Sequence, residues 1–156
     1  MTTDHPLPLR SQPWEGELRL NPDIHGRSRV PGPRPAGFDL GDFARALEEG
    51  DLDRQRSQYA PEVEVVVIDP DNTPAAPQVL QGRPAVDGWL LHASTSHLGL
   101  RVTELVDGGE RVAFTERWQH QDGTSVVATS TAVIEDSLIA WQQVVLVWDH
   151  DGGEGW

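Results

Sequence analysis

The sequence predicts an α+β fold in which helices cover one face of a cone-shaped, curved, antiparallel or mixed sheet. Helix signals are confined to the first half of the body, between residues 38 and 97. Residues 111–149 form three runs rich in Val, Thr, Ile, Phe and Trp, separated by two short polar breaks. Helices and antiparallel strands that are segregated along the chain are typical of α+β folds.

Three short helices are expected in the first half of the body. Asp39 is suited to cap the first, which ends at Gly50, and Asp51 caps a second that runs to about Tyr59. The third begins at residues 82–84, Gly-Arg-Pro, because proline is favoured in the first turn of a helix. Its apolar residues recur at helical spacing, at Val86, Trp89, Leu90 and Ala93.

Strands are expected at residues 62–69 and 98–106 and in the three runs of 111–149, which read as a meander. Asp122-Gly123 favours a two-residue type I′ hairpin turn, and Glu135-Asp136-Ser137 is the second break. If both turns have two central residues, Glu116 lies opposite Thr129, and Thr129 lies opposite Val144. The proline-broken stretch 69–78 is expected to be a loop.

The period of two along each strand then assigns side chains to the two faces of the meander. One face is expected to carry Val112, Phe114, Glu116, Trp118, Val127, Thr129, Thr131, Val133, Gln142, Val144, Leu146 and Trp148. The other, which includes Arg117 and Gln143, is not cleanly polar either. A sheet without a polar face is covered on both sides, by helices, a second subunit or a ligand. Helices laid across one face of a strongly curved sheet would leave a cone-shaped cavity.

The chain of 156 residues is expected to form one domain with flexible ends. Residues 1–37 hold seven of the twelve prolines and are expected to be a flexible arm. Residues 38–150 form the body, and residues 151–156 form a flexible tail.

Composition excludes several classes of function. The net charge of −13 and the pI near 4.6 argue against nucleic-acid binding. All twelve basic residues are arginine and cysteine is absent, which excludes lysine Schiff bases, thiol nucleophiles and cysteine-zinc sites. No run is long enough to span a membrane, so a soluble cytoplasmic protein is expected.

Two carboxyl groups are the candidate catalytic residues. Glu116 lies between Phe114 and Trp118, where loss of solvent would raise its pKa toward the range useful for acid–base work. The alternative is that Glu116 pairs with an arginine or lies at a wet edge of the sheet. Asp69 precedes Pro70 at the end of a strand, where the alternative role is to cap a turn. Together they would place a base and an acid across the cavity.

Neutral polar and aromatic side chains are the candidate ligand contacts. We expect the ligand to touch Phe43, Trp89, Phe114, Trp118, Thr129, Thr131 and Gln142. His92 and His97 have no metal-binding spacing and no supporting carboxylates, so no metal or other cofactor is expected. His120 lies beside a turn and is expected to be exposed.

Several sequence segments resemble the nuclear transport factor 2-like superfamily, especially its SnoaL-like and ketosteroid-isomerase-like branches. Residues 43–65, FARALEEGDLDRQRSQYAPEVEV, resemble the opening of that fold. Residues 82–86, GRPAV, resemble the start of its third helix, residues 112–118 one of its strands, and Val147-Trp148-Asp149 its closing motif. The resemblance covers about residues 38–150 and implies the α+β cone, often dimeric.

The resemblance also implies where catalytic groups would lie. Asp69 falls close to the aspartate base of ketosteroid isomerases, allowing a two-residue insertion. Their oxyanion-binding tyrosine would fall on Phe43, which has no hydroxyl, and their protonated aspartate near Thr131. SnoaL-like cyclases place their aspartate near that same position, and the Asp-Arg-Asp set of limonene-type epoxide hydrolases is not found. Each familiar active site is at least partly missing.

Two functions follow as expectations. The first is a cofactor-free acid–base enzyme, of the isomerase, cyclase or epoxide hydrolase class, acting on a small apolar molecule in the cone. The second is a non-catalytic small-molecule-binding domain or a dimeric interaction domain. In both cases a homodimer is expected.

Overall fold

A computed structural model describes residues 37–95 and 97–149 of the chain. The predicted flexible arm, except for its last residue, and the predicted tail lie outside the described residues. The described part contains three helices and six strands, and its α+β class confirms the prediction.

The three helices lie close to where the sequence places them. α1 spans Leu40–Glu49, α2 spans Leu52–Ser57 and α3 spans Arg83–Ser94. The Asp39 side chain accepts a hydrogen bond from the Asp42 amide at 2.9 Å and so caps α1, which ends at Gly50 with φ of 67°. α2 is shorter than predicted because Tyr59, expected at the end of this helix, is the first residue of a strand.

The strands form one mixed sheet with the order β2-β1-β6-β5-β4-β3. Their bounds are Tyr59–Ile68 for β1, Gln78–Gln81 for β2, Leu98–Asp107 for β3, Arg111–Gln119 for β4, Ser125–Glu135 for β5 and Leu138–Asp149 for β6. β1 pairs with β6 in parallel, and the other pairs are antiparallel. The short edge strand β2 was not predicted. It follows the expected proline-broken loop and pairs with β1 at the edge of the sheet.

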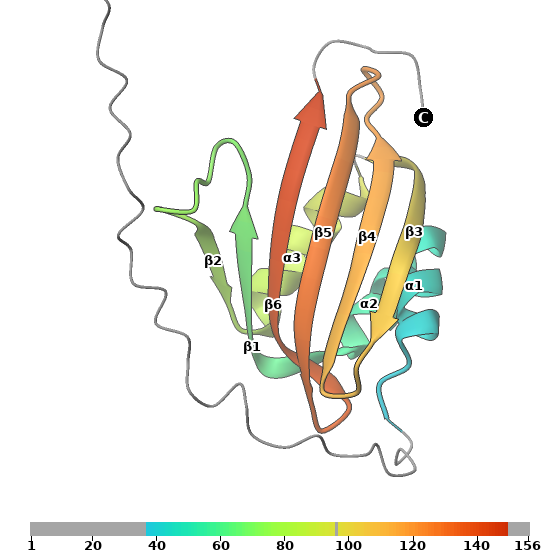
Figure 1. Ribbon diagram of the computed structural model, residues 1–156, viewed down its shortest axis with the longest axis vertical. Coiled ribbons are helices and arrows are strands. Elements are labelled where there is room, and N and C mark those ends of the chain that lie inside the picture. Colours follow the sequence, from blue (N-terminus) through green and yellow to red (C-terminus); the bar gives the residue numbers. More distant parts are fainter. Residues whose placement is uncertain (1–36, 96, 150–156) are drawn as a thin grey trace, which may run out of the picture. The chain divides into compact units, whose positions relative to one another are not determined.

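All three helices lie on one face of the sheet, and the long strands β4, β5 and β6 curve around them (Figure 1). The core fills the space between these layers and includes Phe43, Tyr59, Val65, Val86, Phe114, Ile139 and Val144. The described residues leave the other face of the sheet uncovered, and there Val145 and Val147 are 38% and 59% exposed. The two faces of the same strands therefore meet very different surroundings.

The predicted register between β4 and β5 was wrong by one residue. Glu116 lies opposite Ala128, and not opposite Thr129. The cause is the turn: Gln119 pairs with Ser125, so five residues connect the strands instead of an even number. The amide of His120 donates to the carbonyl of Thr124 at 2.9 Å and closes this longer loop.

The slip reverses the two faces of β5. Its inward residues are Val126, Ala128, Ser130 and Ala132, all of them buried. Thr129 and Thr131, predicted on the inner face as ligand contacts, are exposed on the outer face. This correction follows from the period of two, in which one residue of register exchanges every side chain on a strand.

A bulge between β5 and β6 restores the predicted faces on β6. Asp136 and Ser137 both have positive φ, 48° and 67°, as a two-residue type I′ turn requires. Ile134 then pairs with Ile139, whereas Val133 pairs with Trp141, so Ala140 is an extra residue. Gln142, Val144 and Leu146 consequently point inward, as predicted. The one-residue shift between β4 and β5 is therefore cancelled by the one-residue bulge between β5 and β6.

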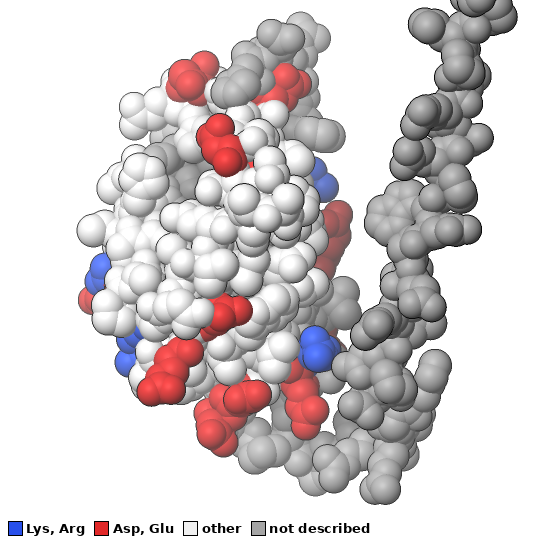
Figure 2. All heavy atoms as spheres, turned by 90° about the vertical axis from the view of Figure 1, so that its left-hand side faces the viewer, with Lys and Arg blue, Asp and Glu red and all other residues white. Residues whose placement is uncertain are grey.

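Acidic side chains dominate the charged surface. The chain carries 25 acidic and 12 basic residues. On the face shown in Figure 2, red Asp and Glu side chains outnumber blue Arg side chains and gather toward the lower and upper ends, with a wide area free of charged side chains between them. The field around the protein is therefore negative, which favours the approach of cations over anions.

Candidate functional site

A cavity of about 300 Å³ lies between the helices and the inner face of the sheet. Five aromatic side chains line it: Phe43 from α1, Tyr59 from β1, Trp89 from α3, and Phe114 and Trp118 from β4. The Phe43 ring packs edge-on against Phe114, with 5.7 Å between ring centroids, and against Tyr59 at 6.0 Å. These contacts give one end of the cavity a packed aromatic wall.

Glu116 is an acidic residue in this aromatic wall. Alternation along β4 places it between Phe114 and Trp118 on the inner face, and its side chain lines the cavity. Among residues 37–95 and 97–149 it has no hydrogen-bond or ion-pair partner. Burial without a partner disfavours the charged form and raises the pKa of Glu116 to about 7. Near neutral pH the group therefore exists in both acid and base forms.

A buried chain of hydrogen bonds runs beside Glu116. The hydroxyl of Tyr59 donates to Oε1 of Gln142 at 2.8 Å, and Nε2 of Gln142 donates to Oγ of Ser130 at 3.1 Å. All three residues are buried, with exposed fractions of 1%, 2% and 0%. Burial, and then the negative charge of Glu116, raise the pKa of Tyr59. The tyrosine is therefore neutral, and its hydroxyl proton takes part in the hydrogen bond to Gln142.

Arg83 fixes the position of Tyr59 from the start of α3. Its guanidinium donates to the backbone carbonyl of Tyr59 through Nη2 and, at 3.1 Å, through Nε. This contact lies where the pairing of β1 with β6 is interrupted between Tyr59 and Glu64. The Gly-Arg-Pro start of α3 thus orients the first residue of β1 and, through it, the Tyr59–Gln142 hydrogen bond.

His97 and Trp118 form another part of the cavity lining. The centroids of the two rings lie 4.4 Å apart, and the ring of His120 packs edge-on against Trp118 with 6.5 Å between centroids. Burial, and then the charge of His120, lower the pKa of His97 to about 4, so its ring is neutral at pH 7. The indole N–H of Trp118 is buried and has no hydrogen-bond partner in the described part of the chain.

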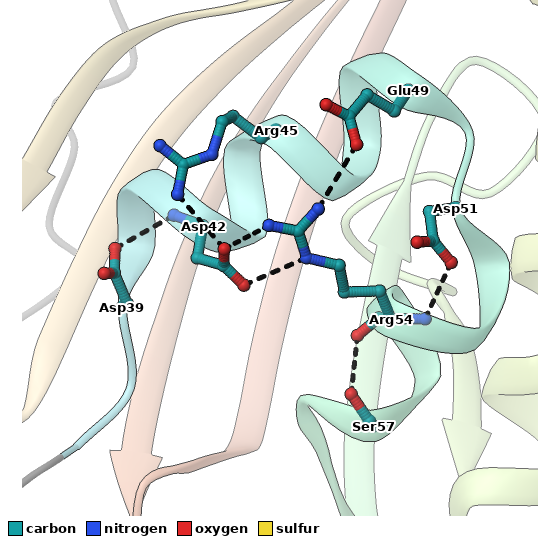
Figure 3. A network of polar contacts seen from close by, with 7 residues as sticks. All are labelled: Asp39, Asp42, Arg45, Glu49, Asp51, Arg54 and Ser57. Atoms are coloured by element: carbon teal, nitrogen blue, oxygen red, sulfur yellow. Dashed lines mark hydrogen bonds and ion pairs between the residues drawn. The ribbon is translucent and has the colours of Figure 1, made fainter.

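An ion-pair network joins α1 and α2 (Figure 3). The guanidinium of Arg54 on α2 contacts both carboxylate oxygens of Asp42 and reaches Glu49 at 3.2 Å. Arg45 adds a second contact to Asp42 at 3.1 Å. Hydrogen bonds from Arg54 and Arg45 lower the pKa of Asp42. The network fixes the end of α1, which contributes Leu47, Glu48 and Glu49 to the cavity lining.

The cavity brings together six of the nine residues expected from the sequence. They are Phe43, Trp89, Phe114, Glu116, Trp118 and Gln142. Thr129 and Thr131 lie on the opposite face, for the reason given above. Asp69 is not part of the lining either.

Asp69 lies in the turn that follows β1. Its Oδ1 accepts hydrogen bonds from the amide of Asp71 at 2.8 Å and the amide of Asn72 at 2.7 Å. The side-chain amide of Asn72 adds contacts of 3.0 and 3.1 Å to the two carboxylate oxygens. The carboxylate therefore holds this turn, which was the alternative role expected from the sequence.

Sequence reasoning missed Tyr59 and Ser130 as part of the site. Tyr59 was placed at the end of a helix, although a proline two residues later and the run of valines after it are also compatible with a strand. Ser130 was assigned to the outer face because it lies between Thr129 and Thr131, which the predicted register placed on the inner face. An odd-membered turn at residues 120–124 would have corrected it, but Asp-Gly favours the two-residue turn.

The described residues show no metal centre and no membrane span. No group of three or more His, Asp or Glu side chains in them is arranged to hold a metal ion. None of their helices is both long and apolar enough to cross a bilayer.

Comparison with known proteins relates both the sequence and the fold to others. A family model described as SnoaL-like domain matches residues 40–142. No curated protein sequence matches the chain.

Solved structures share the fold at low sequence identity. A nuclear transport factor 2-like protein from Burkholderia xenovorans aligns at 15% identity with a TM-score of 0.56, covering 75% of this chain and 85% of that one. A proposed ketosteroid isomerase from Kribbella flavida gives 14% identity, a TM-score of 0.54, and coverage of 74% and 79%. A proposed polyketide cyclase from Sinorhizobium meliloti aligns at 20% identity with a TM-score of 0.51, covering 67% of this chain and 91% of that one.

Proposed function

Because this chain belongs to the SnoaL-like domain family, within the nuclear transport factor 2-like fold, we propose that it is a cofactor-free acid–base enzyme. Its substrate is a small, largely apolar molecule held in the cavity. One observation carries the proposal: the carboxyl of Glu116, without a partner in the described residues, opens into a cavity walled by aromatic rings. A carboxyl with a pKa of about 7 is suited to both giving and accepting protons at neutral pH.

The reaction class is isomerisation, cyclisation or epoxide hydrolysis, each of which moves a proton on an apolar substrate. Glu116 is the proton-transfer group. Phe43, Trp89, Phe114 and Trp118 supply the apolar walls, and Gln142 is held by Tyr59 and Ser130 as a fixed polar contact. Asp69 and the two outer threonines are not given a role in this proposal.

The test is a turnover screen with carbonyl and epoxide compounds small enough for the cavity. The isosteric variant Glu116→Gln removes the titrating proton and should lower turnover by about 10²- to 10⁴-fold. Glu62→Gln is the matched control, since Glu62 is exposed on β1 and outside the cavity lining. Retained turnover in Glu116→Gln, with the fold intact by NMR, would contradict the assignment of Glu116.

A non-catalytic small-molecule-binding domain is the second candidate. It is favoured by the absence of the hydroxyl that the ketosteroid-isomerase resemblance expects at Phe43, and by the engagement of Asp69 in a turn. Measurable ligand binding without turnover in either the original protein or Glu116→Gln would select this function. Absence of both binding and turnover would contradict both candidates.

We also propose a homodimer formed through the open face of the sheet, in a cytoplasmic protein. The exposed side chains of Val145 and Val147 support it, because burying them in a partner would remove apolar surface from water. Sedimentation equilibrium should give twice the chain mass for the original protein and a single chain mass for Val147→Glu. A single chain mass for both would contradict the dimer.

A further inference from the structure

Among the described residues, the charged side chains that line the cavity are all acidic. Its lining contains Glu48, Glu49 and Glu116, and no arginine is among the described lining residues. His97, the histidine of the described lining, is neutral at pH 7 because burial lowers its pKa to about 4. A ligand that enters this cavity therefore meets carboxyl groups and aromatic rings without a fixed positive charge.

We propose that the ligand of this cavity is an organic cation, an apolar molecule that carries a protonated or quaternary nitrogen which Glu116 and the surrounding rings bind. The inference rests on the proposed binding of a small molecule in the same cavity and specifies that this molecule is positively charged. A neutral ligand would leave the charged form of Glu116 without a counter-ion, whereas an anion would be repelled by that form.

The aromatic wall suits a cation as well as the carboxyl does. The faces of Trp, Tyr and Phe rings carry negative electrostatic potential and attract ammonium groups within about 6 Å of the ring centre. Phe114 and Trp118 flank Glu116 along β4, and Trp89 contributes from α3. A nitrogen beside Glu116 would thus meet a carboxylate and rings together, in a partly enclosed cavity where both attractions are stronger than in open water.

The exposed part of the lining is acidic too. Glu48 and Glu49 are exposed residues of the cavity lining, and each already has a contact. Glu48 accepts a hydrogen bond from the Val102 amide at 2.9 Å, and Glu49 pairs with Arg54 at 3.2 Å. Their role is to add to the negative field of a chain with net charge −13, which raises the local concentration of cations. Glu116 is left as the direct partner.

A bound cation would also set the protonation state of the proposed catalytic group. In the empty cavity Glu116 is divided between acid and base forms near pH 7. An opposite charge within about 4–6 Å lowers the pKa of a carboxyl by about 1 to 3, which converts Glu116 to its base form. The substrate would thereby produce the base that acts on it.

Two probes of the same shape test the inference, phenyltrimethylammonium and tert-butylbenzene, which differ by a positive nitrogen in place of carbon. Binding is followed by NMR on the full chain, and the pKa of Glu116 is read from its carboxyl carbon with Glu116→Gln as the assignment standard. We expect the cation to bind at least about tenfold more tightly than the hydrocarbon and to lower the pKa of Glu116 by about 1 to 3. In Glu116→Gln the preference for the cation should be lost, whereas Glu62→Gln should keep it.

Trp89→Leu provides a second variant, because Trp89 is only partly buried and packs against the buried core without belonging to it. It should weaken cation binding more than hydrocarbon binding, as expected if the ring attracts charge. Hydrocarbon binding as tight as cation binding in the original protein would overturn the inference and leave the proposed function standing. Failure of both probes to bind the original protein and Glu116→Gln alike would overturn the small-molecule site itself.

Discussion

Glu116 and Asp69 are both acidic residues of the sheet, one in the middle of β4 and the other just after β1, and their surroundings differ in nearly every respect. Asp69 accepts hydrogen bonds from two backbone amides and a side-chain amide within three residues of itself. Glu116 has no such donor in the described chain and faces aromatic rings across a cavity.

The difference shows how one type of functional group serves structure in one region and chemistry in another. A carboxylate that is supplied with local donors is stable in its charged form and fixes the backbone around it. A carboxyl that is partly withdrawn from water and lacks donors is costly when charged, and that cost is what makes it able to exchange protons near neutral pH. Replacing each carboxyl group in turn should reveal this difference.

The largest effect is expected for Glu116→Gln on the pH dependence of stability. Below about pH 4.5, the ordinary pKa of the group, Glu116 is protonated in both native and unfolded protein and has no cost. As the pH rises to about 7, the unfolded chain loses this proton while the native protein keeps it, so stability falls by up to about 3 kcal/mol. Above that range the loss is complete and stays constant.

Glutamine removes this titration. Chemical denaturation should find Glu116→Gln more stable than the original protein at pH 8 by up to about 3 kcal/mol, and the difference should shrink toward pH 4. Glu62→Gln, at an exposed position, is the control for the loss of one negative charge. An unchanged difference between pH 4 and pH 8 would mean that Glu116 is solvated, and the contrast with Asp69 would disappear.

The sequence was sufficient to predict Glu116 but not its neighbours on β5. Alternation within β4 depends only on residues 111–119, so Phe114, Glu116 and Trp118 were assigned to one face regardless of any turn. The face of β5 depends on the number of residues between the strands. The hydrogen bond between His120 and Thr124 closes a loop of five residues. The preference of Asp-Gly for two-residue turns does not predict this bond.

The faces of β6 were predicted correctly because two features that the sequence did not predict have opposite effects. The five-residue turn moved β5 by one position relative to β4, and the bulge at Ala140 moved β6 back. Bulges respond to sheet curvature and packing, which are properties of the whole fold. The same holds for Tyr59, whose place in β1 depends on pairing with a strand about 80 residues away. Local patterns thus fixed single strands, whereas contacts between strands decided which β5 residues reach the cavity.

A smaller effect is expected when the buried hydrogen-bond chain beside Glu116 is broken. Tyr59→Phe removes the donor to Oε1 of Gln142 and leaves a buried acceptor without a partner, which should cost about 1 to 3 kcal/mol. Thermal or chemical denaturation measures the loss. The variant that combines Tyr59→Phe with Gln142→Leu and Ser130→Ala removes all three polar groups and should regain part of it. Equal or greater loss in the combined variant would show that packing, and not hydrogen bonding, accounts for the effect.

The smallest effect is expected at Asp69, and it should be confined to stability. Asp69→Ala removes the acceptor of several hydrogen bonds in a turn open to water, where solvent can replace them, so the cost should be about 1 kcal/mol. Asp69→Asn keeps an acceptor oxygen and should lose less. Binding of the cationic and neutral probes should be the same in both variants as in the original protein, because Asp69 lies outside the cavity lining. If probe binding or turnover falls in Asp69→Asn while stability is preserved, Asp69 acts on the ligand after all. The two carboxyl groups would then share one site, as the sequence predicted.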